Sequence, residues 1–516
     1  MAVMTGLRRS SVALFIILIL AVQAFAQRPA DLSALDATFA QALKDWAVPG
    51  MAVAIVKDGK VVFAKGYGVK ELGKADPVDD KTLFAIASNT KAFTAAAVAI
   101  LVDEKKLGWD DRVITHLPYF QLYDPYVTND ARVRDLMSHR SGLGTFSGDL
   151  LWYGTAYTRE EVVRRARFLK PVGPFRARYG YQNVMFITAG EVVTTVSGQR
   201  WENFLKARIF DPLGMTDTVT SITALKQNAN VATPHAKLDG AWRTFPWANW
   251  DTMAAAGGVI SSVTDMAKWL RLQLGGGAVD GARVFSQAAQ DVMWTPHTPR
   301  SVGAESRQRF PTTHFRSYGL GWNLWDYRGR RVVDHGGAYD GMFSHVALVP
   351  EEQLGFVILT NSTTSIADAL TYTILDAYLG GGGQDWSLDF LERSKKADAD
   401  AAARATQRQK DRAIGTKPSL ALDAYAGAYG GDLYGDATVA VENGALVLRL
   451  TPNPDMVADL THWHYDTFLI TWRKPFPWWG DGWVQFLMDN RGKVTELKLD
   501  VPNDDFWFWE PEFRKK

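Results

Sequence analysis

Ser88 and Lys91 are two reactive side chains that lie three residues apart in the apolar segment FAIASNTKAF, residues 84–93. The segment continues as TAAAVAILVDE, whose alanines and aliphatic residues predict a buried helix. Residues i and i+3 share one helix face, so Ser88 Oγ and Lys91 Nζ can meet. Burial lowers the pKa of a lysine, which could then take the proton of a serine hydroxyl and make it a nucleophile. The alternative is a buried pair that the fold only satisfies with hydrogen bonds.

Two further motifs carry polar groups suited to such a site. Tyr181-Gln182-Asn183 is the only Y-x-N in the chain, and His335-Gly336-Gly337 is the only H-x-G. The chain has no G-x-S-x-G, H-E-x-x-H, G-x-x-x-x-G-K-[ST] or intact G-x-G-x-x-G pattern. These absences argue against an α/β-hydrolase elbow, a zincin site, a P-loop and a dinucleotide fingerprint.

With the three motifs in this order, the sequence resembles the serine β-lactamase and penicillin-binding protein superfamily. Within it, the sequence is most similar to the class C-like branch of esterases, DD-peptidases and D-amino-acid peptidases. The resemblance covers about residues 32–379 and includes four more segments: DLMSHRSGL (135–143), IFDPLGMTDT (209–218), AAAGGVISSVTDMAKWL (254–270) and YGLGW (318–322).

The resemblance implies a role for each polar residue of the first two motifs. Ser88 would be the acylated nucleophile, and Lys91 would accept its proton. Tyr181 would share the base work and pass a proton to the leaving group. Asn183 would position Lys91 and the substrate amide. No metal or organic cofactor is needed for this chemistry.

The third motif matches the His-x-Gly form of a family motif that is usually Lys-Thr-Gly or His-x-Gly, and it departs from the Lys-Thr usual in β-lactamases. His335, Gly336 and Gly337 would line the cleft on a strand, and Ala338 would supply the second oxyanion N–H beside that of Ser88. Many relatives have Lys-Thr where this chain has His335-Gly336, so the ammonium and hydroxyl that hold a β-lactam carboxylate are missing. Esters or peptides are therefore favoured over β-lactams. We hypothesise that His335 is a third acid–base group that titrates near neutral pH.

The function expected from these motifs is a serine hydrolase that forms an acyl-enzyme. A peptidase acting on D-residue peptides competes with a carboxylesterase, and a β-lactamase is the third option. From another class, the alternative is a catalytically inactive binding or scaffolding protein of the same fold. Intact Ser88, Lys91, Tyr181 and Asn183 argue against that alternative.

Composition and the first residues predict an exported protein. The formal net charge is +1, which favours neither nucleic acid nor an anionic membrane, and the chain has no cysteine. Arg8 and Arg9 precede the apolar run VALFIILILAV, and Ala24-Phe25-Ala26 provides a cleavage site. Residues 1–26 are therefore predicted to be a signal peptide, and the protein to be periplasmic or secreted without stable membrane insertion. The expected partners are a small-molecule or peptide substrate and, in a homo-oligomer, further copies of the chain.

The predicted fold class is α+β, with a second, all-β domain. Hairpins at Asp58-Gly59 and around Pro350 predict that residues 27–382 contain an antiparallel sheet built from both ends of the domain and flanked by helices. Residues 383–417 are charged and alanine-rich and are predicted to be a linker. Turns at Asn443-Gly444 and 490–492 predict an all-β domain over 418–516, which resembles a lipocalin-like barrel. We also expect Asp265 and Lys268 to form a solvated helix face.

Overall fold

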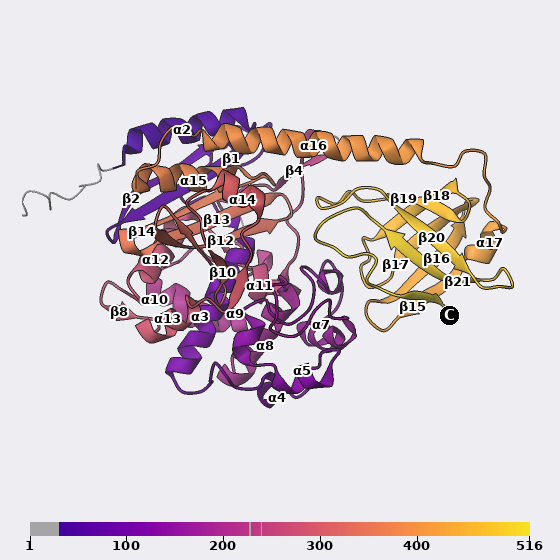
Figure 1. Cartoon of the computed structure of the whole chain (residues 1–516), viewed down its shortest axis with the longest axis horizontal. Helices are drawn as coiled ribbons and strands as arrows, with labels where there is room; N and C mark the ends of the chain where they lie inside the picture. Colours follow the sequence, from indigo (N-terminus) through magenta and orange to yellow (C-terminus); the bar gives the residue numbers. More distant parts are fainter. Residues whose placement is uncertain (1–29, 227–228, 239) are drawn as a thin grey trace, which may run out of the picture.

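The chain folds into a helix-and-sheet domain and a β-barrel, joined by the long helix α16 (Figure 1). The computed structural model describes residues 30–226, 229–238 and 240–516. The predicted signal peptide, 1–26, lies outside these described residues. None of the helices in the described ranges combines the length and the apolar character needed to cross a bilayer.

The first domain contains an antiparallel sheet of eight strands, in the order β2-β1-β14-β13-β12-β11-β10-β9. Both predicted hairpins are present, and the early strand β1 pairs with the late strand β14, with Met51 opposite Thr360. The sheet is therefore built from both ends of the domain, as predicted. Its strands are β1 (Gly50–Lys57), β2 (Lys60–Gly68), β9 (Thr298–Arg300), β10 (Arg316–Tyr318), β11 (Asn323–Tyr327), β12 (Arg330–Tyr339), β13 (Met342–Val349) and β14 (Leu354–Thr360).

Helices cover both faces of this sheet. In β1, Met51, Val53 and Ile55 pack with α2 and α15, whereas the alternate residues face the core that contains α3 and α12. Side chains alternate between the faces of a strand, so a central strand covered on both sides is apolar throughout. The main helices are α2 (Leu32–Asp45), α3 (Thr90–Asp103), α7 (Arg159–Arg165), α8 (Asn183–Ser197), α11 (Ala254–Gly257), α12 (Val263–Leu274), α13 (Gln287–Met293) and α15 (Ile366–Leu379).

Shorter elements complete the domain. Three two-stranded ribbons lie outside the large sheet: β3 (Phe84–Ala85) with β6 (Ile260–Ser261), β4 (His235–Leu238) with β5 (Ala241–Thr244), and β7 (Ala278–Val279) with β8 (Ala282–Arg283). The short helices are α4 (Val113–His116), α5 (Pro125–Asp130), α6 (Val133–Leu136), α9 (Trp201–Leu205), α10 (Asp211–Leu213) and α14 (Ala304–Arg309).

Helix α12 corrects one expectation from the sequence. Ser262 caps it, as its hydroxyl accepts a hydrogen bond from the backbone N–H of Asp265. Asp265 is buried rather than solvated, and its carboxylate accepts hydrogen bonds from the backbone of 217–218 and lies 2.8 Å from Lys268 Nζ. The pair fixes the 211–218 loop against α12, a long-range contact that helical spacing alone does not reveal.

The segment predicted as a linker contains helix α16 (Trp386–Lys410). Its first turns pack on α15, where Trp386 and Phe390 lie 5.0 and 5.9 Å from Tyr372 between ring centroids. The remaining turns are largely exposed and extend to the barrel (Figure 1).

The second domain is a closed antiparallel barrel of eight strands, β15 to β22. The predicted hairpin turns at Asn443-Gly444 and 490–492 are both present. Aromatic side chains such as Tyr425, Phe468 and Phe486 fill the interior. After the short helix α17 (Leu422–Tyr425), the strands are β15 (Gly427–Gly431), β16 (Gly435–Glu442), β17 (Ala445–Leu450), β18 (Val457–His464), β19 (Thr467–Trp472), β20 (Gly482–Met488), β21 (Val494–Asp500) and β22 (Phe513–Lys515).

Candidate active site

Ser88 lies on a short 3₁₀ turn, Ala87–Asn89, that leads into α3. Ala87 has a φ of +46°, a left-handed conformation that is rare for a residue with a side chain. Such strain persists only where surrounding contacts impose it, and it is common at functional sites. Ser88 is half-buried and Lys91 is fully buried, so only the hydroxyl of the pair reaches the surface.

Lys91 Nζ has three polar neighbours, and which of them can donate a hydrogen bond determines the direction of its lone pair. It lies 2.7 Å from Asn183 Oδ1, 2.9 Å from the carbonyl oxygen of Ala256 and 2.9 Å from Ser88 Oγ. Burial lowers the pKa of Lys91 well below its usual value. A neutral amine has two N–H donors and one lone pair, and the two carbonyl oxygens can only accept. In the neutral form, the lone pair of Lys91 therefore faces the Ser88 hydroxyl, which is the geometry that a general base needs.

Asn183 is held by a carboxyl group that sequence reasoning missed. It is the first residue of α8, and its Nδ2 donates to Asp149 Oδ2 over 2.7 Å, which directs its Oδ1 at Lys91. Asp149 is 2% exposed, and burial raises its pKa to about 8. Burial therefore favours the protonated form of Asp149 at neutral pH. No spacing rule links Asp149 to the Y-x-N motif, since the two meet only through the loop at 144–153.

Asp149→Asn tests whether this carboxyl acts as a neutral hydrogen-bonding group. Asn has the shape of a protonated Asp, so we expect kcat/KM at pH 6.5 to fall by less than about tenfold, and Asp149→Ala to cost more because it frees Asn183. The folded-state pKa of Asp149 is raised, so the contribution of this group to the free energy of unfolding of wild type declines as the pH rises from about 4 to 8. The free energy of unfolding of Asp149→Asn should therefore increase relative to that of wild type over that range. Urea melts at several pH values measure this difference. A constant difference would contradict the buried neutral acid.

Tyr181 lies against the same pair of residues. Its ring centroid is 4.7 Å from Lys91 Nζ, and its hydroxyl lies beside Ser88. Burial raises the pKa of Tyr181 well above 10, an effect that the Ser88 hydroxyl only partly opposes. At neutral pH Tyr181 is therefore a phenol that can donate and relay a proton, while Lys91 is the available base.

The third motif lies on β12, which passes directly beside the Ser88 turn. A Cβ added to Gly337 would lie 2.3 Å from the carbonyl oxygen of Ile86 and 3.0 Å from the backbone nitrogen of Ser88. Only glycine fits there, so β12 lies directly against the Ser88 turn at this point. Ser344 Oγ donates to the Ile86 carbonyl over 2.7 Å and so ties β13 to the same turn. Ala338, the predicted second oxyanion donor, is the next residue of this strand after Gly337.

The burial of His335 disfavours the hypothesis that it titrates near neutral pH. Burial, with a smaller effect of Lys91, lowers its pKa to about 3. Its Nε2 lies 2.9 Å from the Tyr318 hydroxyl, and its Nδ1 lies 2.5 Å from the carbonyl oxygen of Gly336. A carbonyl can only accept, so Nδ1 carries the hydrogen and Nε2 accepts from Tyr318. The sequence showed a histidine beside two glycines but not its burial.

His335→Ala should therefore leave the limbs of the pH–rate profile in place. We expect kcat/KM to fall about fivefold to tenfold through loss of the Tyr318 contact, as for one neutral hydrogen bond. Measuring kcat/KM from pH 5 to 9 for both proteins checks this. A limb near pH 6 to 7 that is present in wild type and absent in the variant would restore the acid–base role.

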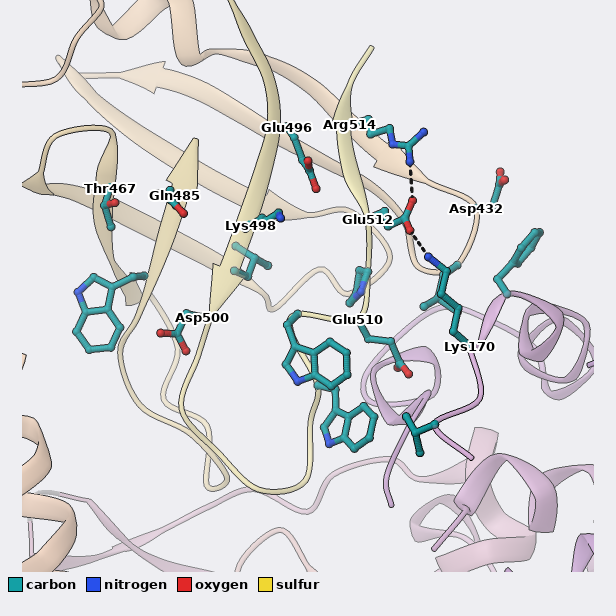
Figure 2. A pocket seen from close by; sticks show the side chains of 18 of the residues that line it. Lys170, Asp432, Thr467, Gln485, Glu496, Lys498, Asp500, Glu510, Glu512 and Arg514 are labelled. Carbon is teal, nitrogen blue, oxygen red and sulfur yellow. Dashed lines mark hydrogen bonds and ion pairs between the residues drawn. The ribbon is translucent and has the colours of Figure 1, made fainter. Parts of the chain in front are cut away.

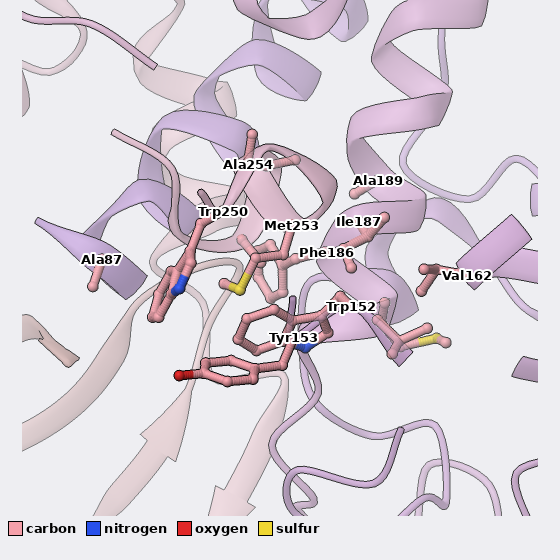
Figure 3. Close-up of a cluster of buried hydrophobic side chains, with 14 of the residues drawn as sticks. Ala87, Trp152, Tyr153, Val162, Phe186, Ile187, Ala189, Trp250, Met253 and Ala254 are labelled. Carbon is pink, nitrogen blue, oxygen red and sulfur yellow. The ribbon is translucent and has the colours of Figure 1, made fainter. Parts of the chain in front are cut away.

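The barrel forms part of the surroundings of this site. Beyond the third motif, the Asp340 carboxylate accepts hydrogen bonds from Tyr153 Oη, at 3.0 Å, and from Trp478 Nε1 of the barrel. On the loop at 144–153, the Trp507 ring lies so close to Gly144 that a Cβ there would be 2.1 Å from it. Figure 3 shows Trp152 and Tyr153 beside Trp250 and Met253, in the core below this loop. The barrel thus contacts Asp340, which follows the third motif, and the loop at 144–153, which precedes the second motif and carries Asp149.

Comparison with known proteins identifies relatives for both domains. A family model described as Beta-lactamase matches residues 35–379, and one described as a domain of unknown function (DUF3471) matches 411–516. An unguisins hydrolase from Aspergillus violaceofuscus is 31% identical over 434 residues, which are 78% of this chain and 76% of that protein. Penicillin-binding protein 4 from Amycolatopsis lactamdurans is 30% identical over 326 residues, 61% of this chain and 81% of that protein.

Solved structures share the fold. An octameric penicillin-binding protein homologue from Pyrococcus abyssi superposes with a TM-score of 0.62 at 22% identity, covering 94% of this chain and all of that one (100%). A D-amino acid amidase from Ochrobactrum anthropi superposes with a TM-score of 0.54 at 22% identity, covering 70% of this chain and 99% of that one.

Proposed function

The chain belongs to the β-lactamase family, in which its relatives include a hydrolase and a penicillin-binding protein, and on that premise we propose that it cleaves amide bonds through an acyl-enzyme formed on Ser88. The observation that carries the proposal is the set of contacts around Lys91 Nζ. Two acceptors take both N–H groups of the neutral amine and leave its lone pair to the Ser88 hydroxyl.

The proposed reaction follows from these positions. Lys91 takes the proton of Ser88 as Oγ bonds to the substrate carbonyl carbon, and the N–H groups of Ser88 and Ala338 hold the resulting oxyanion. The C–N bond then breaks as the leaving amine takes a proton from Tyr181, which Lys91 replaces with the proton taken from Ser88. Water attacks the ester in the reverse sense, with Lys91 again as the base, and Ser88 regains its proton.

Tyr181 favours amides over esters as substrates. An amine leaves only when it is protonated, whereas an activated phenolate leaves without a proton. A phenol beside Ser88 and adjacent to Lys91 is placed to supply that proton. The missing Lys-Thr of the third motif, replaced by His335-Gly336, argues against β-lactams.

Tyr181→Phe distinguishes amide from ester chemistry. We expect kcat/KM to fall by roughly 10²–10³ for an aminoacyl p-nitroanilide, because the proton donor to the amine is lost, and by less than tenfold for the matching p-nitrophenyl ester. Equal losses on both substrates would contradict the proton-donor role. Assaying both substrates in D and L form, with benzylpenicillin alongside, tests the further proposal that D-residue peptides are preferred to L-residue peptides and to β-lactams.

Export and self-association are part of the same proposal. The motif of residues 1–26 supports export, and mass analysis of the protein recovered from its producing cells should find a mature chain that starts at Gln27. Light scattering of the purified protein measures whether it forms a homo-oligomer. A mature chain that retains residues 1–26 would contradict cleavage after Ala26.

A further inference from the structure

A large cavity lies away from Ser88, at the junction of the barrel with the first domain. It is a groove of about 1200 Å³ (Figure 2). One wall is the outer face of β19, β20 and β21, and the other includes residues 168–172 of the first domain. The end of α16 and the segment 507–514 complete it. Figure 2 shows Gln485, Lys498 and Asp500 on the barrel side and Lys170 on the opposite side.

The groove exposes the indole ring of Trp509 to solvent, and further tryptophans line it. Trp509 is 65% exposed, and its ring stacks on that of Trp507, with centroids 4.7 Å apart and planes 25° apart. Trp463 and Trp483 pack edge to face at 5.6 Å further along the lining. Exposing a large aromatic ring to water is energetically unfavourable. Exposed apolar surface at a groove therefore indicates a binding site for a ligand.

Unpaired polar side chains surround these rings. Thr467 lies opposite Gln485 and Gln485 opposite Lys498 across three neighbouring strands, so the three form one row on the outer face of the barrel. Asp500, opposite Trp483, extends the same face. In the part of the chain that the structure describes, none of these four polar side chains has a hydrogen-bonding or ionic partner. The row therefore offers a hydroxyl, an amide, an ammonium and a carboxylate to whatever occupies the groove.

The charges of the groove disfavour a strongly charged ligand. Six carboxylates and four cationic side chains line it, so a polyanion and a polycation would each meet like charges. Some of these groups are already neutralised, since Glu512 pairs with both Lys170 and Arg514 (Figure 2). A ligand that carries many hydroxyls and no net charge can use both kinds of side chain, because a hydroxyl both donates and accepts.

The geometry points to a neutral oligosaccharide as the ligand of this groove. A sugar ring has an apolar face of C–H groups that packs on an indole and a rim of hydroxyls that reaches the polar row. The volume is larger than an ordinary small-molecule pocket of about 300–1,000 Å³, so it accommodates several linked rings. Trp507 also contacts Gly144, so the bound sugar would lie behind the loop that borders the candidate active site.

Isothermal titration of the purified protein with chitohexaose and cellohexaose tests the assignment. We expect saturable binding of at least one of the two neutral hexasaccharides with a change in tryptophan fluorescence, and weaker binding of a heparin hexasaccharide and of hexalysine. Trp509→Ala should weaken binding at least about tenfold, as for the loss of a central aromatic contact. Gln485→Ala should weaken it by a smaller factor. Because both side chains are exposed, neither substitution should lower the thermal midpoint.

Two control variants separate this site from the rest of the protein. Phe315→Ala removes an aromatic ring that is 41% exposed and lies outside the groove, and should bind as wild type does. Ser88→Ala should also bind as wild type, so loss of hydrolase activity and loss of sugar binding are read independently. The assignment is overturned if neither neutral hexasaccharide binds at millimolar concentration, if Trp509→Ala binds as tightly as wild type, or if a charged oligomer binds more tightly.

Discussion

Lys91→Met should lower kcat/KM by roughly 10²–10⁴, the usual contribution of a general base, while the protein stays folded. Methionine fills much of the same buried volume but has no lone pair for the Ser88 proton. The remaining site keeps both converging N–H groups, so residual turnover above the uncatalysed rate is expected. Stopped-flow or fixed-time assays with the p-nitroanilide measure the loss. A variant with more than a tenth of wild-type kcat/KM would contradict the role of Lys91 as the base.

The same variant gives a second signal that a purely structural lysine would not give. Burial depresses the folded-state pKa of Lys91, so between that value and its unfolded pKa of about 10 the unfolded chain binds the extra proton. This group therefore costs wild type more stability as the pH falls through that window. The free energy of unfolding of Lys91→Met should increase relative to that of wild type by up to about 1.4 kcal/mol per pH unit as the pH falls from 9 to 7. A pH-independent difference in urea melts would indicate a lysine that stays charged in the fold.

Gly337→Ala should have an effect of similar size through the backbone. The added methyl would lie 2.3 Å from the Ile86 carbonyl oxygen and 2.6 Å from Ser344 Oγ, so β12 must move away from the Ser88 turn. That movement would separate the N–H groups that we propose as the oxyanion donors, those of Ser88 and Ala338, and loss of one such donor costs roughly 10²–10³ in kcat. Strain of this kind also destabilises a fold by about 1–3 kcal/mol. Turnover and the midpoint of thermal unfolding measure the two effects.

Gly336→Ala is the matched control for this prediction. Side chains on a strand alternate between its faces, and a Cβ at Gly336 would meet nothing closer than the Phe343 ring at 3.6 Å. We expect that variant to keep kcat/KM within about threefold of wild type and to unfold within about 0.5 kcal/mol of it. If Gly336→Ala were as damaging as Gly337→Ala, the close approach of β12 to Ser88 would not explain the loss.

The parts of the fold that were predictable depend on local sequence. Turn residues such as Asp58-Gly59 and Asn443-Gly444 specify hairpins by their backbone preferences, and the structure contains both. The contact of Ser88 with Lys91 follows from helical spacing, and it is present at 2.9 Å. Each of these features needs only residues that are close in the chain.

The missed features depend on residues that are distant in the chain. Asp149 meets Asn183, and Ala256 meets Lys91, only after the loops and helices have packed. The state of His335 also depends on packing, because burial rather than the neighbouring glycines sets its pKa. Motif spacing brings candidate groups together, but burial decides which of them carry a proton at pH 7.

The barrel shows the same limit at the level of domains. Its strands were recognisable from turns and alternation, yet nothing in residues 418–516 indicated that Trp478 would reach Asp340. Contacts of this kind connect the barrel to the end of the third motif. They make the barrel a part of the candidate site's surroundings rather than an independent appendage.

The most direct test of the central claim is intact-mass analysis after brief exposure of the purified protein to a fluorophosphonate, beside Ser88→Ala. We expect one adduct on wild type and none on Ser88→Ala, because the Lys91 lone pair activates that hydroxyl alone. Lys91→Met, measured in parallel, should form the adduct far more slowly than wild type. A folded wild-type protein that takes no adduct, or a Ser88→Ala protein that is labelled to the same extent, would contradict an acyl-enzyme on Ser88.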